Sequence, residues 1–246
     1  MRETYNYNGT EIKANFNKSG NIKLGGAIWS FSTLKGNEDI FIKRLGVAIC
    51  GTCGGHCDCC TKSCYVNKSY RYDDVKYGHA RNTIAIRYDL EGTYNRLNGL
   101  IDRAKNKPSV IRINQSGELE NYGQLEMFAR LASNHPEIAF FLYTKNYSVV
   151  SEALHNGIIP ANMTILISIW HECGLKEYQR LSHYENIKAF VYDDGDFNYS
   201  ENGLNILTWC KAYDESGKLD KNITCQKCKK CFNRNANCKC IGCKAH

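Results

Sequence analysis

Cysteine is the residue whose distribution most restricts the fold of this chain. All fourteen cysteines except Cys173 and Cys210 fall into two segments, residues 50–64 and 225–243. The N-terminus lacks the apolar stretch of a secretion signal, and no apolar run approaches the roughly 20 residues of a membrane span. We therefore expect a cytoplasmic protein without membrane contact, in which clustered thiols bind metal; a disulfide framework is the weaker alternative.

The chain is long enough for one main domain, because 43% of its 246 residues are hydrophobic. Helical patterns alternate with short runs that are apolar on both faces, as strands of a parallel sheet are. The runs lie at residues 45–49, 109–113, 138–143, 163–169, 187–192 and 204–209. The pattern predicts an α/β fold.

Six strand–helix units fit two architectures, an incomplete (βα)6 TIM-like barrel and an open doubly wound sheet, and periodicity does not separate them. In both, the loops at the carboxyl ends of the strands hold the chemistry. Residues 1–44 are expected to form a cap before a first strand at 45–49. We place the main domain at residues 1–215 and a separate metal-binding tail at residues 216–246. A chain ending after Tyr213 should then keep its main domain folded.

The first cysteine segment directly follows the apolar run at residues 45–49, where we expect a metal site. Cys53, Cys57 and Cys60 are separated by three and then two residues. This spacing lets one loop bind three corners of a cubane cluster and leave the fourth iron open. Thiolates suit zinc, copper(I) and iron–sulfur clusters alike. Structural zinc without catalysis therefore stays an alternative.

The same loop resembles the cluster loop of the radical S-adenosylmethionine superfamily. The matching residues are Cys53, Cys57 and Cys60, although Cys59 stands where an aromatic residue is usual. The resemblance implies a barrel of the radical S-adenosylmethionine type, a 4Fe–4S cluster and S-adenosylmethionine as cofactors.

A second register of cysteines resembles another family. Cys53, Cys60 and Cys64 followed by Tyr65 are similar to the cluster segment of the phage gene product 88 family, and the likeness covers residues 45–232. It implies metal content and a location in the host cytoplasm rather than a particular reaction. Cys57 and Cys64 remain alternative ligands of the first cluster.

The likeness to radical S-adenosylmethionine enzymes continues at three later strand ends. A serine–glycine–glutamate segment after residues 109–113 resembles the Gly-Gly-Glu segment that holds the cofactor's amino group, and a polar turn follows the next strand. The implied cofactor-binding residues are Ser116, Gly117, Glu118, Thr144, Asn146 and Ser168. The alternatives are a helix-start carboxylate for Glu118 and a core hydroxyl for Ser168.

Two further polar features lie in predicted strands. Arg112 stands between two isoleucines, so its guanidinium must reach either an anion or the mouth of the barrel. The candidate anions are a ligand carboxylate and the side chain of Glu118 or Glu120. His171 and Glu172 form a possible acid–base pair, but adjacent side chains point in different directions. Catalytic residues therefore stay unassigned.

The second cysteine segment is too polar to fold around an apolar core, so metal must supply its folding energy. The predicted ligands are Cys225, Cys228, Cys231, Cys238, Cys240 and Cys243. Both zinc and a second iron–sulfur cluster suit their spacing. From residue 218 onward, eight basic residues oppose one acidic residue. The basic tail is expected either to bind nucleic acid or to solvate the metal module.

Two functions follow from these features. The first is an enzyme that receives one electron from a donor protein, cleaves S-adenosylmethionine and generates a 5'-deoxyadenosyl radical that acts on an unknown substrate. The second is a non-catalytic, metal-stabilised binder of nucleic acid or of a host defence complex.

Overall fold

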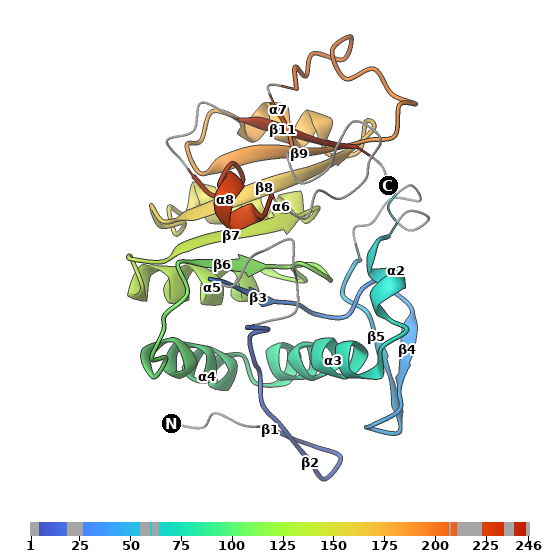
Figure 1. Cartoon of the computed structure of the whole chain (residues 1–246), viewed down its shortest axis with the longest axis vertical. Helices are drawn as coiled ribbons and strands as arrows, with labels where there is room; N and C mark the ends of the chain where they lie inside the picture. Colours follow the sequence, from blue (N-terminus) through green and yellow to red (C-terminus); the bar gives the residue numbers. More distant parts are fainter. Residues whose placement is uncertain are drawn as a thin grey trace.

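A parallel sheet forms the centre of the computed structural model, which describes residues 5–18, 27–54, 60, 64–206, 208–210, 223–233 and 239–244 (Figure 1). Its seven strands have the order β10-β11-β9-β8-β7-β6-β3, and every neighbouring pair is parallel. The strands are β3 (Ile28–Phe31), β6 (Val110–Ile113), β7 (Ala139–Thr144), β8 (Met163–Trp170), β9 (Ile187–Asp193), β10 (Thr208–Trp209) and β11 (Cys240–Lys244). The predicted α/β class with parallel strands is confirmed.

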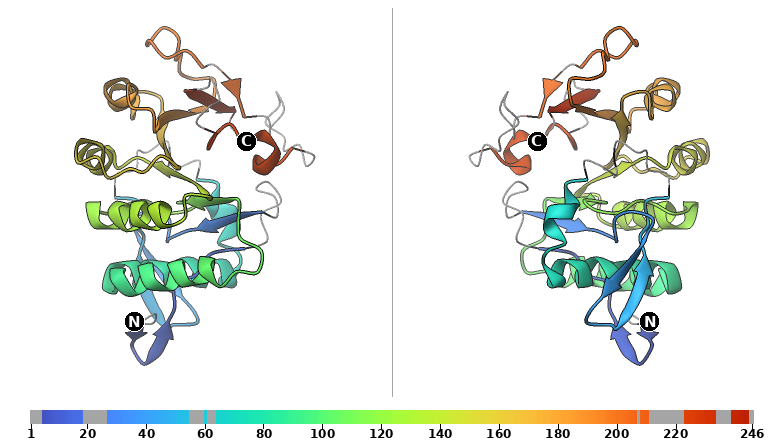
Figure 2. Two further views of the ribbon diagram at one scale, coloured as in Figure 1. Left: turned by 90° about the vertical axis from the view of Figure 1, so that its left-hand side faces the viewer. Right: turned by 90° about the vertical axis from the view of Figure 1, so that its right-hand side faces the viewer.

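The helices lie on one face of this sheet. From β3 to β9 the strands stand side by side in chain order, and the connecting helices stack along a single side (Figure 2). They are α3 (Asp73–Tyr88), α4 (Leu90–Asp102), α5 (Tyr122–Asn134), α6 (Tyr147–His155) and α7 (Leu175–Leu181). A doubly wound sheet reverses its strand order and carries helices on both faces, so that alternative is wrong. The seven strands form an open sheet with β3 and β10 at its edges, which gives no support to the expected incomplete barrel of the radical S-adenosylmethionine type.

The sequence accounts for the packing of these helices. In α5 the expected apolar stripe of Leu125, Phe128, Ala129 and Ala132 is buried against the sheet. The side chain of Asn121 caps the same helix by accepting a hydrogen bond of 3.0 Å from the backbone of Gln124. The helices thereby cover one face of the sheet and leave the opposite face, which we call the open face, to other segments.

The prediction that residues 45–49 form the first strand of the main sheet was wrong. Residues 47–50 form β5 (Val47–Cys50), which pairs antiparallel with β4 (Asp39–Ile42) in a hairpin outside the main sheet. The first strand of the sheet is β3, inside the region expected to be a cap. Only Ile49 of β5 is buried, because a hairpin beside the sheet needs one apolar face rather than two. The first cysteine segment nevertheless still lies in the connection that follows the sheet's first strand.

The C-terminal segment is part of the sheet. β11 lies between β9 and β10 and pairs with both, so the expected boundary after residue 215 does not separate two folding units. Cys240 and Cys243 are buried in this strand. The short helix α8 (Cys225–Cys228) lies over the open face (Figure 2). Two predicted metal ligands, Cys57 and Cys238, fall outside the described residues.

The remaining described elements are peripheral. β1 (Tyr5–Tyr7) and β2 (Thr10–Ile12) form a second antiparallel hairpin, and α2 (Val66–Ser69) precedes α3. No helix among the described residues is long and apolar enough to cross a membrane.

Candidate functional site

The carboxyl ends of β6 and β7 meet at the buried carboxylate of Glu118. Its Oε1 accepts hydrogen bonds from the backbone of Leu119 at 2.8 Å and from the hydroxyl of Thr144 at 2.6 Å. Its Oε2 accepts a bond of 2.6 Å from the backbone of Lys145. Burial raises the pKa of Glu118, and these hydrogen bonds oppose the rise. Glu118 therefore joins two strand ends, while its contact with a cofactor amino group stays a prediction.

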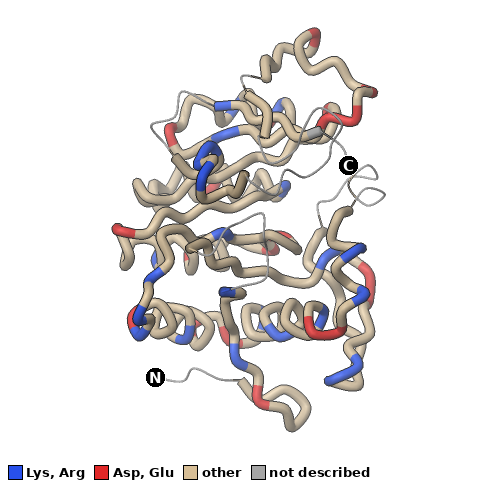
Figure 3. Tube along the Cα trace, in the orientation of Figure 1, with Lys and Arg blue, Asp and Glu red and all other residues tan. Residues whose placement is uncertain are grey.

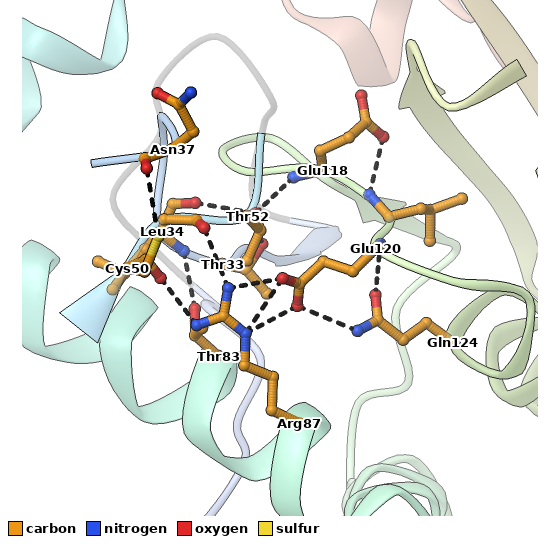
Figure 4. A network of polar contacts seen from close by, with 12 residues as sticks. Thr33, Leu34, Asn37, Cys50, Thr52, Thr83, Arg87, Glu118, Glu120 and Gln124 are labelled. Atoms are coloured by element: carbon orange, nitrogen blue, oxygen red, sulfur yellow. Dashed lines mark hydrogen bonds and ion pairs between the residues drawn. The ribbon is translucent and has the colours of Figure 1, made fainter. Parts of the chain in front are cut away.

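Gly117 lets the loop after β6 approach the loop after β3. Its φ is +78°, and an added Cβ would lie 2.0 Å from the hydroxyl oxygen of Thr33. The hydroxyl of Thr52 accepts a bond of 2.8 Å from the backbone of Glu118 and donates one of 2.9 Å to Leu34 (Figure 4). The start of the cysteine segment is thus fixed to the end of β6.

Cys53 of the first cysteine segment lies close to this carboxylate, and Cys60 and Cys64 lie near Cys53. Burial raises the pKa of Cys53 to about 12, and the negative charges of Glu118, Cys60 and Cys64 add to the rise. The ammonium group of Lys145 donates to Cys60 Sγ at 3.2 Å. These are the cysteines of the second register. We call them, with Glu118 and Lys145, the thiol edge.

The thiols of the described residues are not grouped tightly around a point. No three His, Cys, Asp or Glu side chains in this part of the chain lie close enough together to hold a single metal ion. The predicted metal ligation therefore stays a prediction. Cys228, half-buried at the end of α8, is likewise untested as a ligand.

The other predicted cofactor-binding residues lie near the thiol edge or on the open face. Asn146 follows Thr144 and donates to the backbone oxygen of Leu119 at 3.0 Å. Ser168 is buried in β8 on the same face as Leu166, because side chains alternate along a strand and Leu166 packs on the open face. Ser116 is buried just before Gly117.

Arg87 stabilises the start of the cysteine segment, and sequence analysis missed it. Its guanidinium donates to the backbone oxygens of Cys50 at 2.8 Å and Gly51 at 3.0 Å, and to Glu120 Oε2 at 2.9 Å (Figure 4). A pocket of about 790 Å³ opens beside this network, and Thr52 and Lys145 are among the residues that line it. Glu120 is therefore paired with Arg87 and not with Arg112.

Arg112 projects from β6 onto the open face. Its guanidinium carbon lies 4.6 Å from the ring centroid of Tyr143, and its Nε is buried without a hydrogen-bond partner among the described residues. Burial disfavours the charged form, but Tyr65, Tyr143, Cys225 and Cys231 outweigh burial and raise the pKa of Arg112. Neither carboxylate expected from the sequence pairs with it within the described residues.

A second group of thiols lies beside Arg112. Burial raises the pKa of Cys231 to about 12; the hydrogen bond from Tyr143 and the charge of Arg112 oppose this rise, and Cys225 and Cys210 add to it. Cys210 therefore lies near the tail cysteines, although it is isolated in the sequence. Its place in space depends on the pairing of β10 with β11.

His171 contacts a carboxylate that directly follows the next strand of the sheet. Its Nε2 lies 2.9 and 3.0 Å from the two carboxylate oxygens of Asp194. Burial raises the pKa of Asp194, but the hydrogen bonds from His171 and from the backbone of Asp196 outweigh burial and lower it. The backbone of His171 has a φ of +52°, a conformation uncommon outside glycine. The carboxylate that His171 contacts is therefore Asp194, while the acid–base pair with the adjacent Glu172 stays a hypothesis.

An open-faced parallel sheet with thiols at its carboxyl edge is thus the architecture of this protein. The sequence model of the gene product 88 family matches residues 5–244. The chain belongs to the gene product 88 family, as expected from Cys53, Cys60, Cys64 and Tyr65. No curated protein and no solved structure matches it. The comparisons give no support to the radical S-adenosylmethionine resemblance.

Proposed function

We propose that this protein is an iron–sulfur enzyme of the radical S-adenosylmethionine type. The observation that carries the proposal is the thiol edge, where Cys53, Cys60 and Cys64 gather at the carboxyl ends of parallel strands. Three cysteines would hold three irons of a cubane cluster and leave the fourth for a ligand. Reduction of such a cluster supplies the electron that cleaves S-adenosylmethionine to a 5'-deoxyadenosyl radical.

The chemistry of the residues present fits such a cluster. The three described donors are thiols, which soft metals and iron–sulfur clusters prefer. A cluster binds each cysteine at a different iron, so its ligands stand farther apart than the ligands of one ion. The ammonium of Lys145 favours the thiolate form of Cys60, which ligation requires.

The surroundings of the thiol edge suit a ligand of the size of S-adenosylmethionine. The adjoining pocket of about 790 Å³ lies within the range of small-molecule sites. Trp170 and Tyr192 stack with centroids 4.0 Å apart, and Lys145 Nζ lies 4.8 Å from the Trp170 ring. In this proposal the ring pair offers an aromatic surface for adenine, and Glu118 keeps the strand ends in register around the ligand.

The non-catalytic nucleic-acid binder has less support. Phe232, an aromatic side chain of the tail that could stack on a base, packs against Phe141 with centroids 5.4 Å apart. Lys239 donates to the backbone oxygen of Tyr184 at 2.9 Å, and Lys230 bonds to Thr208. Basic side chains of the described residues are spread over several elements rather than confined to the tail (Figure 3).

The test is anaerobic purification followed by iron and sulfide analysis and paramagnetic resonance of the reduced protein. We expect S-adenosylmethionine to change the resonance spectrum and dithionite to release 5'-deoxyadenosine. Cys60→Ser should lose iron, whereas the control Cys173→Ser, outside both cysteine segments, should keep it. A fully loaded cluster that neither responds to S-adenosylmethionine nor yields 5'-deoxyadenosine would refute the proposal.

A further inference from the structure

The segment that carries α8 is fixed to the open face by protein contacts. Phe232 packs on Phe141, and the ammonium of Lys188 donates to the backbone oxygens of Lys230 at 2.9 Å and Asn233 at 2.8 Å. Lys188 is 1% exposed, so these bonds form beneath the segment. The position of the segment over β6, β7 and β9 is therefore well defined by the fold.

This segment turns two thiols toward the sheet. Cys225 and Cys231 pack against the apolar cluster of the open face, together with Tyr143. The hydroxyl of Tyr143 donates to Cys231 Sγ at 3.2 Å. Cys210 reaches the same region from the end of β10, where its backbone N–H bonds to the oxygen of Gly242 at 2.7 Å.

Arg112 supplies an independent indication that an anionic group belongs here. The guanidinium stacks on Tyr143, the same side chain that bonds to Cys231. Its buried Nε has no partner among the described residues. A buried N–H donor without an acceptor is unfavourable, and an anionic group beside the guanidinium would remove that cost.

We propose that Cys210, Cys225 and Cys231 bind a second iron–sulfur cluster on the open face, with Arg112 as its counter-cation. Each thiol forms a metal–sulfur bond and releases its proton, and no electron transfer is required. Three thiolates on an oxidised cubane iron–sulfur cluster carry one net negative charge, and because each binds a different iron they need not converge on one point as the ligands of a single ion must. The single positive charge of Arg112 neutralises this net charge.

This assignment differs from the one that spacing in the sequence suggests. Cys210 joins the site although it lies outside both cysteine segments. Cys240 leaves it, because its side chain packs in the core between the sheet and the helices, on the opposite face from Ile241. The site shares no cysteine with the thiol edge, so it stands or falls separately from the proposed function.

Metal analysis of full-length variants tests the proposal. We expect Cys210→Ser and Cys231→Ser to lower bound metal relative to wild type, and Cys240→Ala to leave it unchanged. Acid-labile sulfide should be lost together with the iron in the same variants; bound zinc without sulfide would overturn the proposal. Arg112→Met should weaken metal retention against a chelator by about 10- to 100-fold, and Arg112→Lys by less.

A second measurement needs no variant. In wild-type protein, alkylation mapped by mass spectrometry should spare Cys210, Cys225 and Cys231 until the metal is stripped, and then modify all three. Equal alkylation before and after stripping would overturn the proposal. So would equal metal loss in Cys240→Ala and Cys210→Ser. Loss of metal only in Cys53, Cys60 or Cys64 variants would support the thiol edge and refute this second site.

Discussion

Lys145 connects Glu118 to the first group of thiols. Its backbone N–H donates to Glu118 Oε2 at 2.6 Å, and its side chain donates to Cys60 Sγ at 3.2 Å. The carboxylate thus holds the backbone from which the ammonium reaches the cysteine. Changes at Glu118 should consequently affect both the stability of the sheet edge and the thiols beside it.

Replacing Glu118 with glutamine should destabilise the fold. The amide would present an N–H₂ group to one of the N–H or O–H donors around it, so a hydrogen bond to a charged acceptor is lost. We expect the free energy of unfolding to fall by about 1.5–3 kcal/mol in denaturant titrations. The control Glu126→Gln, at an exposed position of α5, should change it by less than about 0.5 kcal/mol. Equal effects of the two variants would contradict the buried network.

Gly117→Ala should be more harmful than Gly157→Ala. Both glycines have positive φ, +78° and +65°, so both substitutions introduce backbone strain of roughly 1–2 kcal/mol. Only at residue 117 would the new Cβ meet another group, Thr33 Oγ1 at 2.0 Å, while nothing lies within 4 Å at residue 157. Thermal unfolding of the two variants measures the difference. A smaller loss of stability in Gly117→Ala would refute the close approach.

His79 should make stability fall in mild acid. Its Nδ1 lies 3.2 Å from the hydroxyl of Tyr70, and burial lowers the pKa of His79 from 6.5 to about 4. The unfolded chain then binds a proton more readily than the folded protein does. The contribution of His79 to the free energy of unfolding is therefore fully present above pH 6.5 and is lost as the pH falls toward 4. This difference in pKa between the unfolded and folded states corresponds to a loss of about 3 kcal/mol in the free energy of unfolding.

The measurement is the free energy of unfolding of wild type and His79→Gln across that pH window. Glutamine retains a hydrogen-bond acceptor for Tyr70 but does not titrate. The free energy of unfolding of wild type should therefore fall more steeply with decreasing pH than that of His79→Gln, because only wild type loses stability through this group. Parallel pH profiles would show that His79 is accessible to protons in the folded state.

A chain that ends at residue 213 should fail to fold cooperatively. It lacks β11, which pairs with both β9 and β10, and it exposes the backbone of β9 together with the core around Ile187 and Ala189. This outcome is the opposite of that expected for a separable tail. Soluble yield and cooperativity of thermal unfolding measure it, with a chain ending at residue 244 as control. Equal cooperativity of both chains would restore the separate-module interpretation.

The sequence by itself determined the α/β class, the parallel strands β6 to β9, the stripe of α5 and the family. These features depend on local periodicity and on the spacing of cysteines within one loop. Both can be read from residues that are close together in the sequence. Strand β3 escaped detection because its four residues form a short run that is difficult to distinguish from other apolar segments. The run at residues 45–49 was misassigned because apolar content does not reveal which sheet a strand joins.

Tertiary structure alone decided which distant groups meet. Three pairs of side chains that meet in the fold are far apart in the sequence. They are Arg87 with Glu120, His171 with Asp194, and Cys210 with Cys231, separated by 33, 23 and 21 residues. Their proximity depends on strand order, and above all on the insertion of β11 between β9 and β10. That order results from long-range burial of both faces of the sheet, for which no local pattern in the sequence is a sufficient signal.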